Sequence, residues 1–263
     1  MFGIGLRNLH HKYILQNEPR VDFFEIHCEN FIANGGASID LLEKISKKYP
    51  LSFHCVGLSI GSANGVDKKH LAEIKKLCDL FKPILLSDHL SWSGSNQGFS
   101  NDLLPIPYTK KSLEIFVNNT KKVQDFLGQE ILIENPSAYL EFEEADFFEV
   151  DFLNEVANKA NCAILLDINN VFVSSKNFSF DAKKYLQNID FSRVKEIHLA
   201  GHSIENIDGQ EIRIDTHSTK ICNEVLQLYK NFLKKNIPTL IEWDEEIPEF
   251  SVLFDEMQKV KNL

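Results

Sequence analysis

The sequence lacks the features that mark several large classes of protein. No apolar run approaches the roughly 18 residues of a membrane span, and the N-terminus has no basic segment followed by a long apolar core and a cleavage site. The net charge of −10 provides no excess of positive charge for sequence-independent binding to nucleic-acid phosphates. We therefore expect a cytoplasmic protein that binds neither membranes nor nucleic acid.

Cysteine is scarce and irregularly placed. The five cysteines are odd in number, and none are spaced as C-x-x-C, which disfavours both a disulfide framework and a thiolate zinc site. They are Cys28, Cys55, Cys78, Cys162 and Cys222. Most are predicted to be small core residues, while Cys28 and Cys55 lie near expected strand ends and are open to a local role.

Nucleotide-binding and serine-hydrolase motifs are also missing. Gly57, Gly61 and Gly65 match neither the G-x-G-x-x-G nor the Walker spacing, and no Gly-Lys-Ser/Thr occurs. The sequence contains no G-x-S-x-G either. The chemistry must therefore come from another arrangement of side chains.

One pattern recurs along the chain: a short apolar segment that ends in an ionisable side chain. The run Ile131-Leu132-Ile133 ends in Glu134 and Asn135, and Pro136 stops the strand that this run predicts. Similar segments end at His54, at Asp88 and His89, at Asp167, at His198 and at Glu242. Acids and imidazoles are therefore expected where strands finish.

The spacing of these segments predicts eight strands, at 2–7, 21–28, 51–56, 83–87, 130–134, 163–167, 194–199 and 238–242. Helical segments are expected at 38–48, 67–80, 109–126, 147–159, 181–187, 217–235 and 249–260, with a long loop at 91–107 and a hairpin around Asp208-Gly209. At 263 residues with 43% apolar residues, one barrel fits as well as two small domains. We favour an α/β fold with a single domain over residues 1–263, a (β/α)₈ TIM barrel.

Active sites of such barrels lie at the C-terminal ends of the strands, so the strand-end residues are expected to converge there. His54, His89, Glu134, Asp167, His198 and Glu242 form a mixed nitrogen and oxygen ligand set that suits iron, manganese or zinc. Asp215 and His217 bring the candidates to eight, more than one ion ordinarily needs. Two or more metals bridged by Glu134 or Asp167 would use them all, and would relieve the repulsion between carboxylates.

Simpler roles exist for each of these residues taken alone. An acid after a strand is commonly a helix cap, as Asp215 could be, and a lone histidine more often forms a hydrogen bond than a metal ligand. His10, His11 and His70 look like surface residues, although His10 lies near the end of the first strand. Residues that could contact the ligands or the substrate are Arg7, His10, Glu25, His27, Asp88, Asn135, Asn169 and His202. Of these, His202 lies in a glycine-containing loop that could bring it towards substrate.

Nine short motifs together resemble the multinuclear non-heme iron-dependent oxidative enzymes. They are Gly3 to Arg7 with His10, Phe24 to His27 with Glu29-Asn30-Phe31, Ser87 to Trp92, Asn101 to Pro105, Glu134 to Ser137, Leu166 to Asn170, His198 to His202, Asp215-Thr216-His217 and Ile241 to Asp244. Each motif is moderately specific, and their shared order along the whole chain makes the set highly specific. Cys55 and Ser218 stand where that family commonly has glycine.

The resemblance implies a xylose-isomerase-like TIM barrel that holds two or three iron ions and uses dioxygen. Characterised members, such as the methanobactin oxidase, modify cysteine or other residues of ribosomally made precursor peptides, often with a small partner protein that presents the peptide. Carried onto this chain, one iron would be held by His54, His89 and Glu134. Glu134, Asp167, His198 and Glu242 would hold a second, and Asp215 and His217 match the positions associated with a third.

Two other functional classes stay open from the sequence. Barrels with histidine and carboxylate ligands also perform divalent-metal-dependent isomerisation of sugars and hydrolysis of phosphodiesters. A non-catalytic metal-binding or scaffolding protein is the third possibility. Iron dependence, oxygen consumption and a neighbouring gene for a cysteine-rich peptide would separate these classes.

Overall fold

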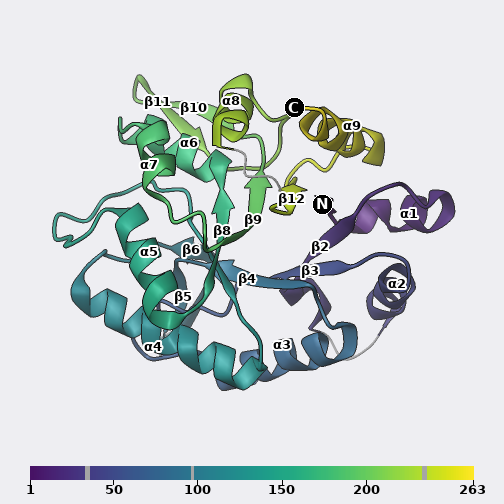
Figure 1. Ribbon diagram of the computed structural model, residues 1–263, viewed down its shortest axis with the longest axis horizontal. Helices are drawn as coiled ribbons and strands as arrows, with labels where there is room; N and C mark the ends of the chain where they lie inside the picture. Colours follow the sequence, from purple (N-terminus) through teal and green to yellow (C-terminus); the bar gives the residue numbers. More distant parts are fainter. Residues whose placement is uncertain (33–35, 96–97, 233–235) are drawn as a thin grey trace.

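A computed structural model describes residues 1–32, 36–95, 98–232 and 236–263 as a closed barrel of eight parallel strands surrounded by helices (Figure 1). The strands are β1 (Phe2–Gly5), β2 (Phe23–His27), β3 (Leu51–His54), β4 (Leu85–His89), β7 (Leu132–Glu134), β8 (Ala163–Asp167), β9 (Val194–Leu199) and β12 (Thr239–Ile241). They follow one another around the barrel in chain order, and β12 pairs with β1. The predicted TIM barrel is confirmed.

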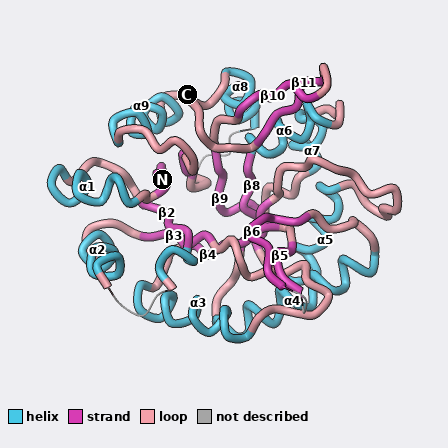
Figure 2. The backbone as a smooth tube through the Cα atoms, turned by 180° about the vertical axis from the view of Figure 1, so that it is seen from behind, coloured by secondary structure: helices cyan, strands magenta, loops and turns pink. Residues whose placement is uncertain are grey.

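Helices form the outer ring of the molecule, as the view from behind also shows (Figure 2). They are α1 (His11–Asn17), α2 (Ala37–Ser46), α3 (Lys68–Phe81), α4 (Lys110–Leu127), α5 (Glu149–Ala160), α6 (Ile168–Asn177), α7 (Ala182–Asn188), α8 (Asn223–Phe232) and α9 (Phe250–Lys261). Local signals set several ends: the Asp67 carboxylate caps α3, and Gly128 closes α4 with a φ of 72°.

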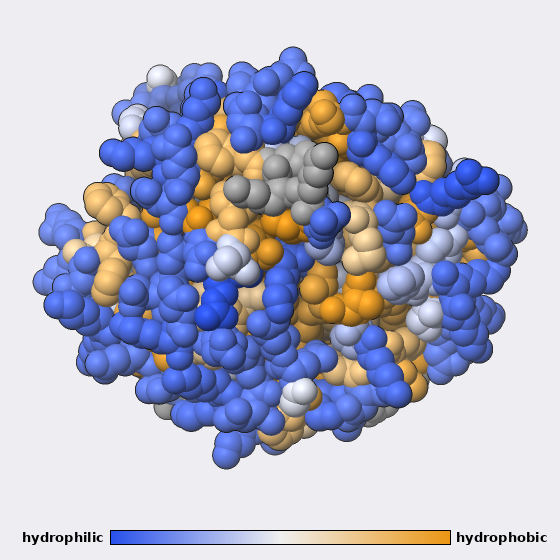
Figure 3. Space-filling model, in the orientation of Figure 1, coloured by the Kyte–Doolittle hydropathy of each residue, from blue (hydrophilic) through white to orange (hydrophobic). Residues whose placement is uncertain are grey.

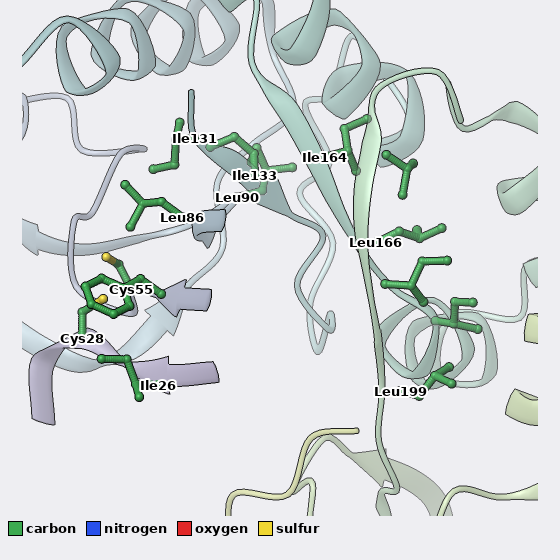
Figure 4. Packing of buried hydrophobic residues seen from close by; sticks show 14 of the residues in the cluster. Ile26, Cys28, Cys55, Leu86, Leu90, Ile131, Ile133, Ile164, Leu166 and Leu199 are labelled. Carbon is green, nitrogen blue, oxygen red and sulfur yellow. The ribbon is translucent and has the colours of Figure 1, made fainter. Parts of the chain in front are cut away.

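Successive strand residues point alternately to the helices and to the barrel interior, which separates apolar from polar side chains. Ile26, Leu86, Ile133 and Leu166 are among the outward residues that pack under the helices (Figure 4). Cys28 and Cys55 lie beside each other in this layer, and all five cysteines are free thiols. Burial raises the pKa of the Cys28 and Cys55 thiols, which fits core residues and gives no sign of reactive thiolates.

Two antiparallel hairpins extend from the C-terminal ends of barrel strands. The hairpin of β10 (Ser203–Ile207) and β11 (Gln210–Ile214) turns at Asp208-Gly209 as predicted. The other, β5 (Trp92–Ser95) with β6 (Gly98–Leu104), replaces most of the predicted loop 91–107, of which residues 96–97 lie outside the described part. The expectation of an irregular loop was wrong because backbone pairing, together with the hydrogen bond from the Trp92 indole to the Pro105 carbonyl (3.0 Å), outweighs a composition rich in Ser, Gly and Asn.

Two helical regions also differ from the prediction. The expected helix 217–235 begins only at Asn223, so Asp215 cannot cap it, and residues 233–235 lie outside the described part. Helix α6 was not expected. It starts directly after β8, and Asp167 accepts a hydrogen bond from the Asn170 amide (2.6 Å) at its first turn.

The face of the molecule drawn in Figure 3 is largely hydrophilic, with hydrophobic side chains visible between the polar ones. This distribution matches the amphipathic helices, which turn their apolar sides to the barrel. Within the described ranges, the helices include none with the length and apolar character needed to cross a membrane.

Candidate metal centre

The predicted ligands lie on the interior face of the barrel at the C-terminal strand ends. Strand register explains their proximity, because His89 is paired with Glu134 and Asp167 with His198. His27 is paired with His54 in the same way. All six strand-end candidates are buried: His54, His89, Glu134, Asp167, His198 and Glu242.

His54, His89 and Glu134 form the first group of potential ligands. The Nε2 atoms of His54 and His89 lie 3.3 and 3.2 Å from the same oxygen, Oε2 of Glu134. The other ring nitrogen of His54 shares a hydrogen bond with the Ser87 hydroxyl (2.7 Å), which fixes the orientation of the ring. This leaves the Nε2 atom of His54 directed at the common point.

Glu134 also belongs to a second group, with Asp167, His198 and Glu242, in which one potential ligand atom of each lies within 4.8 Å of the others. The Nδ1 atom of His198 is 3.0 Å from Oε2 of Glu242 and 3.8 Å from Oε1 of Glu134. Glu134 therefore presents one carboxylate oxygen to each group, as a bridging ligand would.

The donor set and its spacing fit metal ions. Atoms that bind one ion at about 2.1 Å lie about 3.0 to 3.4 Å from each other, and both nitrogen–oxygen distances of the first group fall in this range. Among the described residues, Oε2 of Glu134 and Oδ2 of Asp167 are buried without a hydrogen-bond donor. Buried carboxylate oxygens are costly when unpaired, so a cation bound by them would remove this penalty.

Asp215 and His217 lie beside the second group. The Nε2 atom of His217 is 2.7 Å from Oδ1 of Asp215 and 3.9 Å from Oδ2 of Asp167. Its Nδ1 atom is 3.3 Å from Oε2 of Glu242 and 3.2 Å from Oδ2 of Asp244. All eight predicted ligands are thus brought together, although binding of metal by them stays a prediction.

Burial and mutual repulsion perturb the ionisation of these groups. Burial is the main reason that the pKa of Glu134 rises to about 8 and that of Asp167 to about 7. Burial is the largest single influence on the pKa of His89 and lowers it, but Glu134, Asp88 and Glu242 together outweigh burial and raise this pKa to about 9. Without metal, the centre therefore retains protons that a metal ion would displace.

A second polar layer, which the sequence analysis missed in part, lies deeper in the barrel. Oε1 of Glu25 is 3.2 Å from Nε2 of His198, and Oε2 of Glu25 accepts a hydrogen bond from the Ser52 hydroxyl (2.8 Å). Glu196 completes this layer and was not among the predicted residues. The available signal was its position two residues before His198 in a strand, which places both side chains on one face.

Arg7, His27 and Asp244 lie at the outer edge of the centre. The Arg7 guanidinium donates to the Trp243 carbonyl (2.9 Å) and pairs with Asp244. Nε2 of His27 lies 3.4 Å from Oε1 of Glu242. Arg7 and His27 can orient the Glu242 carboxylate, and the Arg7 guanidinium, 3.8 Å from Oε1 of Glu242, balances part of the negative charge of Glu242 and Asp244.

The remaining candidates divide between the centre and its supports. Asp88 accepts hydrogen bonds from the Leu58 amide (2.9 Å) and the His89 amide (2.6 Å), and so holds the loop after β3 against β4. His10 shares a hydrogen bond with the Pro248 carbonyl (2.8 Å) and packs on Phe250, so the structure does not bring it to the ligand groups. His10 and His11 are also buried, which corrects the expectation of surface residues, because the turn that ends at His10 and the first residue of α1, His11, both pack inward.

Asn135 connects the ends of β7 and β8. Its side chain donates to the Asp167 carbonyl (2.9 Å) and accepts from the Asp167 amide (3.0 Å), and all three groups are buried. Asn154 makes a comparable pair of backbone hydrogen bonds, to Asn188 (2.8 Å) and Asp190 (2.9 Å), on the outside of the protein. Asn154 therefore serves as a matched control.

We expect Asn135→Ala to lower the free energy of unfolding by about 2–4 kcal/mol, because it leaves a buried amide and a buried carbonyl unpaired. Asn154→Ala should cost less, since water can replace the lost bonds. Urea denaturation of both metal-free variants checks this. An equal loss of unfolding free energy in the two variants would show that burial does not strengthen the contribution of the Asn135 hydrogen bonds.

Comparison with known sequences gives relatives across nearly the whole chain. A UPF0276 protein from Psychromonas ingrahamii is 46% identical over 264 residues, with 99% of this chain and 93% of the relative covered. A UPF0276 protein from Vibrio parahaemolyticus is 44% identical, with 100% and 92% covered.

Solved structures with the same fold are much more distant in sequence. The 3-keto-D-glucoside 4-epimerase YcjR from E. coli has a TM-score of 0.59 at 11% identity, covering 100% of this chain and 99% of its own. Endonuclease IV from Thermus thermophilus has a TM-score of 0.61 at 13% identity, with 99% and 98% covered. These likenesses show the xylose-isomerase-like fold. The family described as "RiPP precursor modification enzyme MbnB/TglH/ChrH" matches residues 1–263, and the chain belongs to this family of enzymes that modify ribosomally synthesised precursor peptides.

Proposed function

We propose that this protein is an iron-dependent oxidase that uses dioxygen to modify cysteine, or other, residues of a ribosomally synthesised precursor peptide. The observation that carries the proposal is that two groups of potential metal ligands share Glu134. The chain that holds them belongs to a family of enzymes that modify precursor peptides. Two adjacent metal sites suit a reaction that moves several electrons. The ligands are imidazoles and carboxylates, a set that accommodates iron as well as manganese or zinc, and the choice of iron comes from the family resemblance.

The eight predicted ligands would bind the ions in three groups. His54, His89 and Glu134 would hold one ion, while Glu134, Asp167, His198 and Glu242 would hold a second. Asp215 and His217 would contribute to a third. Bound iron would supply the electron transfer to dioxygen.

The chain's own groups set the geometry around those ions. Ser87 fixes the ring of His54, and Asn135 fixes the backbone of Asp167 beside the centre. Glu25 faces His198 from the barrel interior and favours a ring orientation in which Nδ1 points to Glu134 and Glu242.

The peptide would approach from the rim at the C-terminal strand ends. The segment after β7 exposes Tyr139, Leu140 and Phe142, and Tyr139 accepts a hydrogen bond from the Asp215 amide (2.8 Å). These apolar side chains offer contact area beside the centre without requiring a basic peptide. A small partner protein could present the peptide there, and we place the reaction in the cytoplasm, where ribosomal peptides are made.

The test is co-expression with the precursor peptide from a neighbouring gene, followed by mass spectrometry of the peptide. With iron and air, we expect a mass change confined to a modified residue. The same purified components under strict anaerobic conditions should leave the peptide unchanged. Turnover without oxygen would contradict the oxidase proposal while leaving the family assignment intact.

A divalent-metal isomerase or hydrolase is the alternative, favoured by the fold shared with a sugar epimerase and an endonuclease. This alternative predicts turnover of a sugar or a phosphodiester with manganese, magnesium or zinc, and no oxygen consumption. Oxygen-electrode measurements on the iron- and manganese-loaded proteins separate the two proposals.

A further inference from the structure

His202 lies just beyond the potential ligands, in the segment that joins β9 to β10. A Cβ on Gly201 would lie 2.1 Å from the Thr219 carbonyl oxygen, so only glycine permits this close approach. The Thr219 hydroxyl also donates to the His202 carbonyl (3.2 Å). The segment that the sequence suggested could move is therefore fixed, and the imidazole has a defined place at the rim.

Asn169 determines which nitrogen of His202 carries the proton. The Asn169 amide nitrogen donates to Oδ1 of Asp215 (2.7 Å), because a carboxylate can only accept. The Asn169 oxygen then faces Nδ1 of His202 (2.9 Å) and must accept its hydrogen. The neutral ring thus has its lone pair on Nε2, which makes no hydrogen bond to any residue in the described ranges.

The surroundings keep this ring neutral near pH 7. Burial and the Arg213 guanidinium lower the pKa of His202, His217 acts in the same direction, and the carboxylates of Asp215 and Glu224 oppose them. The ring of Phe172 packs beside it, with 5.3 Å between the ring centroids. A neutral, oriented and half-buried imidazole is suited to accept a proton.

We infer that Nε2 of His202 accepts the proton of the substrate thiol as that thiol enters the centre. The inference rests on the proposed function, in which a cysteine side chain is the substrate. A free thiol has a pKa of about 8.5 and must lose its proton to become a ligand. In this step the S–H bond breaks and an N–H bond forms on Nε2, with no change in oxidation state. Asn169 connects His202 to Asp215, so the imidazole ring lies beside the candidate third site.

The test counts protons by titration calorimetry, with zinc-loaded protein and N-acetylcysteine amide as the probe. Binding is measured at pH 7.5 in buffers of different ionisation enthalpy. The thiolate that binds beside the ring adds a negative charge that favours the protonated imidazole, so the native protein should release close to zero protons per bound thiol. His202→Asn should release about one proton more, while the control His70→Asn, in which the ring paired with Glu29 is lost, should behave like the native protein.

Equal proton release by the native protein and His202→Asn would overturn the role of His202. A native protein that binds no thiol at all would instead contradict thiol coordination, and with it the cysteine chemistry of the proposed function.

Discussion

Glu134→Ala is expected to remove metal from both main ligand groups at once. Glu134 supplies one oxygen near His54 and His89 and the other near His198, so its loss reduces both groups together. After reconstitution with iron, metal content should fall from two or more ions per chain to one or none. Modification of the peptide should fall by at least 100-fold, since even residues that only support metal ligands commonly cost 10- to 100-fold.

Glu130→Ala is the matched control for this experiment. Glu130 lies four residues earlier in the same segment, on the surface, where it pairs with Lys195. Its removal should change neither metal content nor activity. Elemental analysis and Mössbauer spectroscopy of iron-57-grown protein give the number of ions and whether they are coupled. A full complement of coupled iron in Glu134→Ala would contradict the bridging role.

The metal-free variant also has to be shown to fold. The pKa of Glu134 rises to about 8, so the buried carboxyl is largely protonated at pH 7, and the isosteric amide of Glu134→Gln keeps its shape while removing its titration. We expect metal-free Glu134→Gln to be at least as stable as the native protein. Loss of iron in a variant of unchanged stability separates a ligand role from misfolding.

The positions of most of the ligands could be predicted from sequence because they stand at or near the end of a short apolar segment. Parallel strands all end at one face of the barrel, so the order of the runs was enough to predict that His89, Glu134 and Asp167 meet. The pairing register of the strands determines which ligand atoms face each other, and this cannot be read from the individual sequence segments. Only the structure shows that His54 and His89 share one oxygen of Glu134.

Helix α6 could not be predicted because its residues are poor helix formers. It contains three asparagines, two valines and two serines in ten residues, and Asp167 is both the end of a strand and the cap of the helix. Packing overrides these local preferences, since eight of its residues are buried. This helix carries Asn169, which explains how that side chain reaches Asp215 and His202.

Glu196 was missed for a different reason. An acid in the middle of a strand usually faces solvent, and the neighbouring Lys195 does. The interior of this barrel is polar well below its mouth, however, with Glu25, Ser52 and Glu196 all buried. The alternation of the strand was visible in the sequence, but the depth of the polar layer follows from the whole barrel.

The second large effect is a loss of stability of the metal-free protein as pH rises from 7 to 9. In the folded chain the pKa of Glu134 is about 8, whereas a carboxyl in an unfolded chain has lost its proton well below pH 7. The pKa of His89 is about 9, also above its unfolded value. Both groups keep a proton in the folded state that the unfolded state has already lost.

Linkage then fixes the direction of the effect. Where the folded state binds more protons than the unfolded state, the free energy of unfolding falls with pH, by about 1.4 kcal/mol per pH unit for each extra proton. The contribution of His89 is fully present below its unfolded pKa and is lost as pH rises through about 9. Glu134 acts in the same direction: the folded state loses the proton on this carboxyl as pH rises through about 8, and the free energy of unfolding falls over the pH range below that value.

Urea denaturation of chelator-treated protein at pH 7, 8 and 9 measures this slope, and Glu134→Gln should flatten it because the amide does not titrate. Stability that rises over this range, or an unchanged slope in Glu134→Gln, would contradict the assignment. Added zinc should reverse the trend between pH 6 and 8, because ligands that have already lost their protons bind metal more tightly. If the groups that hold the extra protons are also the groups that bind the ion, the slopes with and without zinc should be opposite in the native protein, and Glu134→Gln should weaken both slopes.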